Sequence, residues 1–377
     1  MKAVGAAAVA ALVLAALLLR PAAEIDPDHI ELTVGSSHST GLPWVGVMHT
    51  LVVPESNRRL EARGSPYRIR WTEAYGGSLY KYHHTLEAVE IGLADMGWVG
   101  TIWELSKMPL QNLTYYTPFS TSDPQMLFRV MNELNEQVPA FADSWTAQNL
   151  RFLGVNASDT YHLMTNFPVR TVDDLRGRKI LAPGPAAAWL KGTGAVAVDG
   201  GLTTYYTQIQ TGVADGVLTI LSGALPYRIH EVAPHITLVG IGAQVTGAFS
   251  MNLDTWDSLP PDVQQVFAEL GPAYSEAVAA EVVERYETSL ETMRMEGAIV
   301  AELPIEEKRR WLDGLPNIAV EWAEATEARG FPAVEALHAY MRTIRDRGAQ
   351  PLRDWDEAAV LEAPPGVGGA GAQVTPD

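Results

Sequence analysis

Between residues 171 and 220, short apolar segments alternate with helical segments, and this order constrains the fold more than any other feature of the chain. Three segments have the length and composition of buried strands: residues 179–182, 195–198 and 216–220. The segments between them, residues 186–191 and 203–211, are predicted to be helices. Strands joined in this way by helices form a parallel sheet that is covered on both faces. The sequence therefore predicts an α/β fold.

The length of the chain predicts two lobes rather than one. It has 377 residues, 47% of them hydrophobic, and single hydrophobic cores stop growing at about 250 to 300 residues. We expect residues 24–155 to form the first part of lobe 1 and residues 156–250 the main part of lobe 2. Residues 251–363 are expected to add returning strands and C-terminal helices to both lobes, with helix breaks at Gly271-Pro272 and at Pro304.

Both ends of the chain differ in composition from its body. Lys2 precedes an apolar run over residues 3–19, which has the shape of a signal peptide and predicts export. Residues 1–23 are thus expected to be a signal peptide or, because Pro21 spoils the cleavage site, an uncleaved N-terminal anchor. Residues 364–377 are rich in Gly and Pro and are expected to form a disordered tail.

Charge and cysteine content exclude several classes of protein. The formal net charge is -18, and such a surface repels nucleic acid, so no nucleic-acid partner is expected. The chain has no cysteine, which excludes disulfides, thiol nucleophiles and thiolate metal sites. His83 and His84 are adjacent and face different sides of any helix or strand, and no third ligand follows at zinc spacing. No metal site is predicted.

Four motifs resemble those of a known family. Residues 86–97, LEAVEIGLADMG, resemble the signature of the solute-binding subunit of tripartite ATP-independent periplasmic (TRAP) transporters, the dicarboxylate-binding-protein-like group. Three more stretches agree in order and spacing: VDDLRGRKI at 172–180, YTQIQTGVADG at 206–216 and NLDTWDSLP at 252–260. Together they span most of residues 30–330.

The resemblance implies a fold and a function. The expected fold is the two-lobed periplasmic-binding-protein-like α/β fold, with a hinge and a long lobe-spanning helix near residues 274–294. The expected function is to capture a small-molecule solute in the cleft and deliver it to TRAP membrane permease subunits. A periplasmic location, no catalysis and no cofactor are also implied. Asp95 and Asp215 lie between glycine turns, where local hydrogen bonding is a better interpretation than catalysis.

The candidate site departs from the family pattern at one position. The family's usual carboxylate clamp is an arginine directly after the Lys-Ile of the second motif, and Leu181 stands there. The family's common asparagine after the third motif is also replaced, by Thr219. Because leucine neither donates hydrogen bonds nor neutralises an anion, we expect a solute other than the usual organic acid: an amine, a neutral compound or an aromatic compound.

Apart from Leu181, the predicted ligand-binding residues are aromatic or hydroxylic, and we expect Trp98 and Tyr161 to lie at strand ends that face the cleft, where α/β proteins bind ligands. They are His38, Trp98, Tyr161, Leu181, Trp189, Tyr205, Tyr206 and Thr219. For any one Trp or Tyr, ordinary core packing is the competing interpretation. Two functions remain as alternatives on the same frame: a secreted α/β enzyme and a ligand-sensing binding protein. The chain contains no Gly-x-Ser-x-Gly elbow, phosphate loop or zinc motif that favours an enzyme.

Overall fold

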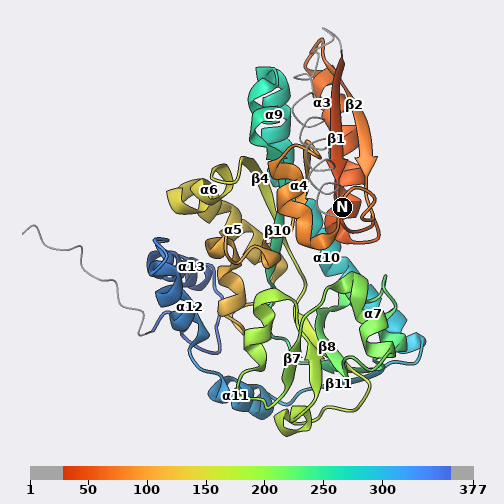
Figure 1. Cartoon of the computed structure of the whole chain (residues 1–377), viewed down its shortest axis with the longest axis vertical. Coiled ribbons are helices and arrows are strands. Elements are labelled where there is room, and N and C mark those ends of the chain that lie inside the picture. The colour runs from red at the N-terminus through yellow and green to blue at the C-terminus, as the bar shows by residue number, and fades with distance from the viewer. Residues whose placement is uncertain (1–28, 358–377) are drawn as a thin grey trace, which may run out of the picture.

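A computed structural model describes residues 29–357, which fold into two lobes, each built around one β-sheet (Figure 1). The predicted signal peptide or anchor at 1–23 and the predicted tail at 364–377 lie outside the described residues. Among the helices of residues 29–357, none combines the length and the apolar character that a membrane span requires.

The first lobe is built on a five-stranded sheet with the order β2-β1-β3-β10-β4. β1 is parallel to β2 and β3, whereas β10 is antiparallel to β3 and β4. Its strands are β1 (His29–Gly35), β2 (Arg68–Ala74), β3 (Met96–Val99), β4 (Leu150–Ala157) and β10 (Val245–Asn252). Its helical elements are α2 (Pro43–Val47), η1 (Met48–Val52), α3 (Val53–Ala62), η2 (Tyr82–His84), α4 (Thr85–Glu90), η3 (Thr101–Trp103), η4 (Pro109–Tyr116), α5 (Pro124–Gln137), α6 (Pro139–Thr146) and α9 (Leu253–Ser258).

The second lobe is built on a six-stranded sheet with the order β11-β9-β5-β8-β6-β7. Its strands are β5 (Tyr161–Thr165), β6 (Lys179–Leu181), β7 (Val196–Val198), β8 (Gly216–Ile220), β9 (His235–Leu238) and β11 (Ile299–Glu302). The predicted parallel winding is confirmed, because β6 is parallel to both β7 and β8. The helical elements are η5 (Val172–Leu175), η6 (Gly184–Leu190), α7 (Leu202–Gln210), α8 (Leu221–Ala224) and η7 (Ile229–Glu231).

The chain crosses between the two sheets at a hinge. Residues 158–160 connect β4 to β5, and residues 239–244 connect β9 back to β10. β10 belongs to the first sheet, so the border that we expected at residue 250 falls inside a strand. The two connections run side by side: the Ser158 amide donates to the Gln244 carbonyl, and the Tyr161 amide donates to the Gly242 carbonyl.

A third link between the lobes is the 35-residue helix α10 (Pro261–Met295). Its first part packs in the core of the first lobe, and Leu290 and Met293 near its end pack in the core of the second. The helix break that we predicted at Gly271-Pro272 is wrong, since α10 runs through both residues. Close packing explains the continuity: a Cβ on Gly271 would lie 2.1 Å from the Leu153 carbonyl oxygen, so the helix backbone rests directly on β4.

Three C-terminal helices return over both lobes: α11 (Ile305–Gly314), α12 (Ile318–Glu327) and α13 (Ala333–Asp346). The predicted break at Pro304 is confirmed, and Pro304 precedes the first turn of α11. α13 packs on α5 of the first lobe, and α11 packs on η5 of the second (Figure 1).

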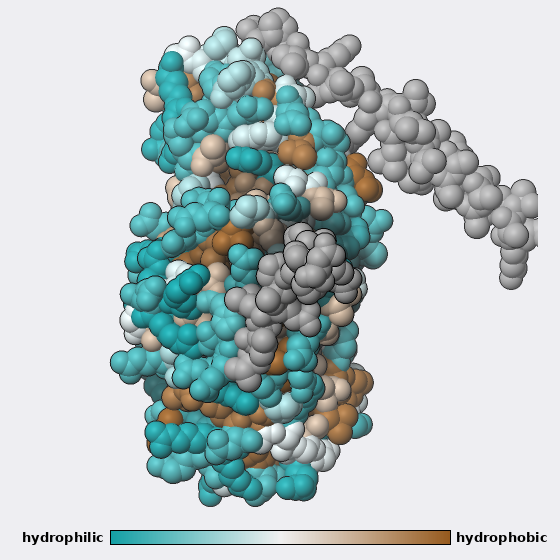
Figure 2. Space-filling model, turned by 90° about the vertical axis from the view of Figure 1, so that its left-hand side faces the viewer, coloured by the Kyte–Doolittle hydropathy of each residue, from teal (hydrophilic) through white to brown (hydrophobic). Residues whose placement is uncertain are grey.

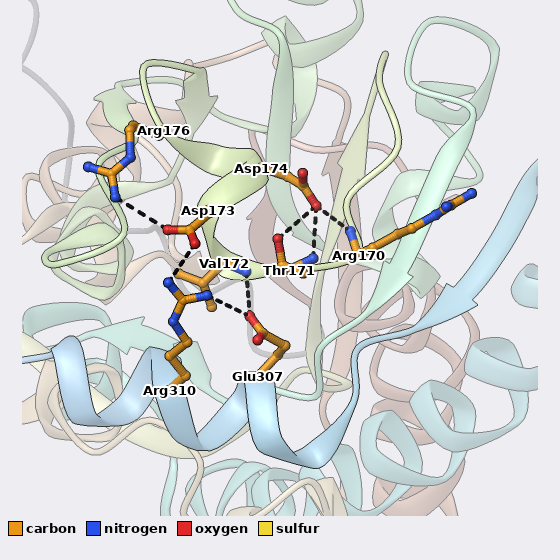
Figure 3. Close-up of polar contacts among 8 residues, drawn as sticks. All are labelled: Arg170, Thr171, Val172, Asp173, Asp174, Arg176, Glu307 and Arg310. Atoms are coloured by element: carbon orange, nitrogen blue, oxygen red, sulfur yellow. Dashed lines mark hydrogen bonds and ion pairs between the residues drawn. The ribbon is translucent and has the colours of Figure 1, made fainter.

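Ion pairs and capping bonds fix α11 to the second lobe (Figure 3). Glu307 accepts a hydrogen bond from the Val172 amide at 2.7 Å, and Arg310 pairs with Asp173 at 2.6 Å. The capping-box spacing of Thr171 and Asp174 is confirmed, because the Asp174 carboxylate accepts from the Thr171 amide at 2.8 Å.

The outer surface is mainly polar. On the face that Figure 2 shows, hydrophilic residues predominate, and apolar residues form smaller, separated patches. This distribution fits a strongly acidic chain with a formal net charge of -18.

Candidate functional site

A small cavity of about 40 Å³ lies between the two lobes. By comparison, a cavity of about 150 Å³ holds one benzene molecule, and one water needs about 10 to 15 Å³. The first lobe contributes His38, Trp44, Trp98, Ile102, Trp103 and Thr246 to its wall, and the second contributes Tyr161, Pro183, Gly201, Leu202, Tyr205, Thr219 and Ile220. A solute larger than a few atoms therefore enters only if the lobes move apart.

His38 lies at the centre of an aromatic cluster on the first-lobe side. Its ring stacks on Trp103, with centroids 6.1 Å apart and planes 13° apart. Trp98 and Trp44 form edge-to-face pairs with the same imidazole, with centroids 5.2 Å and 6.1 Å apart. The loop after β1 carries His38 and α2 carries Trp44, so the cluster joins segments that all follow β1 or β3.

The imidazole of His38 is uncharged at neutral pH. The residue is 2% exposed, and burial lowers the pKa of His38 to about 4. Nδ1 lies 3.0 Å from the Ser37 hydroxyl, with which it shares a hydrogen bond. His38 thus offers the cavity a neutral polar ring rather than a positive charge.

A short hydrogen-bond chain fixes Trp98 in the wall. Its indole N–H donates to the Asn156 side-chain oxygen at 2.6 Å, and the Asn156 amide donates to the Thr246 hydroxyl at 2.6 Å. These bonds connect β3, β4 and β10 beneath the cavity. The indole therefore presents its ring to the cavity while its polar atom is satisfied elsewhere.

Tyrosine and threonine side chains form the second-lobe side. Tyr161 and Tyr205 are almost fully buried, and burial raises the pKa of both phenols, so they are neutral at pH 7. The Tyr205 hydroxyl donates to the Gly200 carbonyl, and the Tyr161 hydroxyl lies 3.0 Å from that of Tyr115. Thr219 on β8 supplies a hydroxyl from the centre of the second sheet.

Among the described residues that line the cavity, none is an arginine, lysine, aspartate or glutamate. An ionised carboxylate moved from water into such a wall would lose its hydration and gain no counter-charge. An uncharged molecule avoids that cost. The cavity therefore suits groups that stack on aromatic rings or share single hydrogen bonds with neutral partners.

Five of the eight predicted ligand-binding residues lie together in this wall: His38, Trp98, Tyr161, Tyr205 and Thr219. The other three do not. Leu181 is fully buried in the core of the second lobe, in the same cluster as Tyr205. Trp189 is fully buried beside Tyr161, and half-buried Tyr206 bonds to Glu231 on η7.

Sequence reasoning missed several wall residues, and the reasons differ. Trp44 lies on the short helix α2, and Ile102 and Trp103 lie on η3, which follows directly after β3. Gly184 shows how closely the lobes meet there. It has φ +48°, and a Cβ on it would lie 2.5 Å from the Ile102 carbonyl oxygen. The sequence did contain a signal for Trp103, which comes three residues after Gly100 at the end of a predicted strand.

The two aspartates of the glycine turns have structural hydrogen bonds, as predicted, but to partners distant in sequence rather than to local amides. Asp95 accepts from the Thr33 amide at 2.7 Å, and Asp215 accepts from the Lys179 amide at 2.9 Å. Each carboxylate thus joins the start of one strand to its neighbour in the sheet. In residues 29–357, no group of three His, Asp or Glu side chains is placed to hold a metal ion.

Comparison with known proteins identifies the family. Residues 68–325 match the family described as bacterial extracellular solute-binding protein, family 7. The chain belongs to this family. A curated member, the C4-dicarboxylate-binding periplasmic protein DctP of Rhodobacter capsulatus, is 27% identical over 280 residues, which are 71% of this chain and 80% of that protein.

Solved structures of family members share the fold. A TRAP periplasmic solute-binding protein from Sulfitobacter sp. NAS-14.1, with bound β-D-galacturonate, superposes with a TM-score of 0.71 at 17% identity, over 83% of this chain and 100% of that one. A TRAP solute-binding protein of an unidentified marine microbe, specific for aromatic acid ligands, gives a TM-score of 0.74 at 16% identity, over 85% and 99%.

These findings establish the general class of the protein. It is a TRAP-type solute-binding protein for a small solute, with the two-lobed, hinged fold and lobe-spanning helix of that class. The family consists of periplasmic proteins that take part in transport and are not enzymes, and its TRAP members work with a membrane permease.

Proposed function

We propose that this chain captures a small solute without net charge in the interlobe cavity and delivers it to a TRAP membrane permease from the periplasm. The observation that supports the proposal is the composition of the cavity wall: among the described residues that form it, no side chain is charged, and His38 is neutral at pH 7. The two similar solved structures hold or select acids, whereas this wall offers an acid no cation.

The identity of residue 181 is not the basis of this proposal. Leu181 packs in the same core cluster as Tyr205 and is not among the described residues that line the cavity. The proposal depends instead on the whole wall, in which no described residue supplies the positive charge of the family's usual arginine. A carboxylate bound there would be buried without a partner, which is the arrangement that proteins avoid most consistently.

Among uncharged solutes and amines, the aromatic cluster favours the uncharged ones. Indole faces bind ammonium groups when they are open to the cation. Here the His38 ring already stacks on Trp103, and Trp44 and Trp98 form edge-to-face pairs with His38. We therefore expect amines to bind less tightly than neutral aromatic or carbonyl compounds of the same size.

Sets of compounds matched in size test the proposal. We expect benzamide to raise the melting temperature of the purified protein more than benzoate or benzylamine does, and acetamide to do so more than acetate, because a ligand stabilises the state that binds it. Stabilisation by the carboxylates alone would contradict the proposal. Mass spectrometry of the same mixtures gives the test for turnover, which a secreted enzyme would show.

Delivery to the permease is tested separately. Cells that contain the cognate TRAP permease are expected to take up labelled solute only when this chain is present in the periplasm. Hinge closure explains why, since a permease that docks on the closed form distinguishes loaded from empty protein. Solute-dependent binding to a membrane receptor without uptake would instead indicate a sensor.

A further inference from the structure

Buried aromatic residues form a row of hydrogen bonds and ring contacts from α11 to the residues behind the cavity wall. The Trp311 indole on α11 donates to the Trp189 carbonyl oxygen at 2.7 Å. The Trp189 indole on η6 donates in turn to the Tyr115 carbonyl oxygen on η4 at 2.6 Å. All three residues are at most 1% exposed, so water does not compete for these bonds.

Ring contacts extend the row to the cavity wall. Trp189 stacks on Tyr115, with centroids 5.5 Å apart and planes 12° apart, and its ring meets Tyr161 edge-on at 5.1 Å. The hydroxyls of Tyr115 and Tyr161 share a hydrogen bond at 3.0 Å. Tyr161 lines the cavity, so Trp189 lies one layer behind the wall.

The bond from Trp189 to Tyr115 crosses between the lobes. η6, which carries Trp189, follows β6 and packs on β7 of the second sheet. η4, which carries Tyr115, packs on β10 and α6 of the first lobe. At the second-lobe end, Glu307 and Arg310 attach α11 to η5 (Figure 3).

We propose that Trp189 is a positioning residue for solute capture, whose indole bond to Tyr115 holds the two lobes closed and keeps Tyr161 in the cavity wall. The proposal rests on the proposed function, since it takes this cavity as the solute site. Trp189 acts through Tyr115 and Tyr161 and touches no solute. Without its N–H, the buried Tyr115 carbonyl loses its donor, and the closed form is less favoured relative to an open form in which water reaches that oxygen.

The structure offers a closely matched control. Trp355 is fully buried, and its indole donates to the Pro118 carbonyl oxygen at 2.7 Å. Trp355 follows α13, which packs on α5, and Pro118 follows η4, so this bond lies within the first lobe. Trp189→Phe and Trp355→Phe therefore remove the same kind of bond, and only the first removes one between lobes.

Interlobe distances in the solute-free protein test the proposal. The chain has no cysteine, so Glu61→Cys on α3 and Gln210→Cys on α7, both exposed, give two sites for nitroxide labels whose separation pulsed electron resonance measures. We expect Trp189→Phe to raise the ratio of long to short distances about fivefold, and Trp355→Phe to leave it unchanged. Equal distributions in the two variants would overturn the proposal.

A second variant guards against misfolding of the first. Tyr115→Phe removes the hydroxyl bond to Tyr161 and keeps the backbone carbonyl that Trp189 uses, so a smaller shift in the same direction is expected. An unchanged distribution in Tyr115→Phe together with a misfolded Trp189→Phe would also overturn the proposal. No solute is added in this experiment. The distances therefore test the role of Trp189 even if the predicted preference for uncharged solutes is wrong.

Discussion

The solute cavity and the hinge are both buried between the lobes, but the hinge contains an ionisable carboxyl group and the cavity wall does not. The hinge contains Asp159, which is 3% exposed and accepts hydrogen bonds from the amides of Leu221 and Ser222 and from the Ser222 hydroxyl. Next to the hinge, His162 on β5 bonds through its ring nitrogens to the Gly240 amide and the Tyr286 hydroxyl, and burial keeps it neutral by lowering its pKa to about 3. The cavity wall, by contrast, contains no carboxylate among its described residues.

The difference follows from what each region must do. Hinge groups keep the same partners through the chain's own backbone, so a buried polar group can be fully satisfied. A cavity that alternately holds solvent and solute has no fixed partner for a charge. Burying a charge without partners costs free energy. The hinge offsets this cost with permanent hydrogen bonds, and the cavity wall avoids it by having no charge among its described residues.

The largest expected effect on stability comes from a charge placed in an apolar core, away from both the hinge and the cavity. Leu181→Arg puts a guanidinium into the apolar core of the second lobe, next to Val217 on the neighbouring strand β8. We expect a loss of about 3 to 5 kcal/mol in the free energy of unfolding, measured by urea denaturation. Leu181→Met, which keeps the volume, is the control and is expected to cost less than about 1.5 kcal/mol. A stable arginine variant that binds benzoate would show that residue 181 reaches the cavity.

The hinge aspartate should make stability depend on pH. Burial raises the pKa of Asp159 to about 6, against an ordinary value of 3.8. Between these values the folded protein holds a proton that the unfolded chain has released, so the free energy of unfolding falls as pH rises from 4 to 6, by up to about 3 kcal/mol.

The comparison with Asp159→Asn isolates this contribution. The asparagine variant lacks the proton, so the difference in unfolding free energy between the native protein and the variant should decrease from pH 4 to 6 and then level off. Urea denaturation at four pH values measures it. His38 and His162, whose pKa values burial lowers, contribute the opposite slope in both proteins and cancel. A constant difference would contradict a buried, proton-binding Asp159.

In the cavity wall, the bond beneath Trp98 should have a smaller effect on stability. Trp98→Phe keeps an aromatic ring and leaves the Asn156 side-chain oxygen without its donor. We expect a loss of about 1 to 3 kcal/mol in the free energy of unfolding. Trp98→Phe combined with Asn156→Leu and Thr246→Val removes all three polar partners of this chain and should recover part of the loss. No recovery in the triple variant would show that ring size, not the hydrogen bond, matters here.

The smallest expected effect is the pH response of solute binding. With a pKa of about 4, His38 remains neutral throughout the range from pH 5.5 to 8. The affinity for an uncharged solute should therefore change less than about twofold over this range. Isothermal titration at three pH values checks this. A tenfold gain at the acidic end would mean that the imidazolium, and hence charge, takes part in binding.

Much of the fold could be predicted from local patterns. The β6, β7 and β8 winding and the Thr171–Asp174 capping box depend on residues close in sequence, and both are confirmed. Pro272 was misread because the rule that proline ends helices ignores packing. The approach of Gly271 to β4 stabilises a continuous helix there and has no signature in the sequence around it.

The site was only partly predictable, because its wall combines residues from many elements. Strand ends indicated Trp98 and Tyr161, and the resemblance to the family motif indicated Thr219; all three line the cavity. Leu181 was selected by its place in a motif, and its side chain packs on the core side of the sheet. Trp189 is a buried aromatic like Trp98, and only the three-dimensional structure separates the two: one faces the cavity and the other bonds across the lobes.

The measurement that tests the central claim most directly is the ratio of dissociation constants for an amide and its carboxylate, determined by titration calorimetry at pH 7 on the unmodified chain. For benzamide against benzoate, an uncharged cavity wall predicts at least about tenfold tighter binding of the amide, since the carboxylate would be buried without a counter-charge. Tighter binding of benzoate would contradict the account, and would mean that a cation reaches the cavity when the lobes close on an acid.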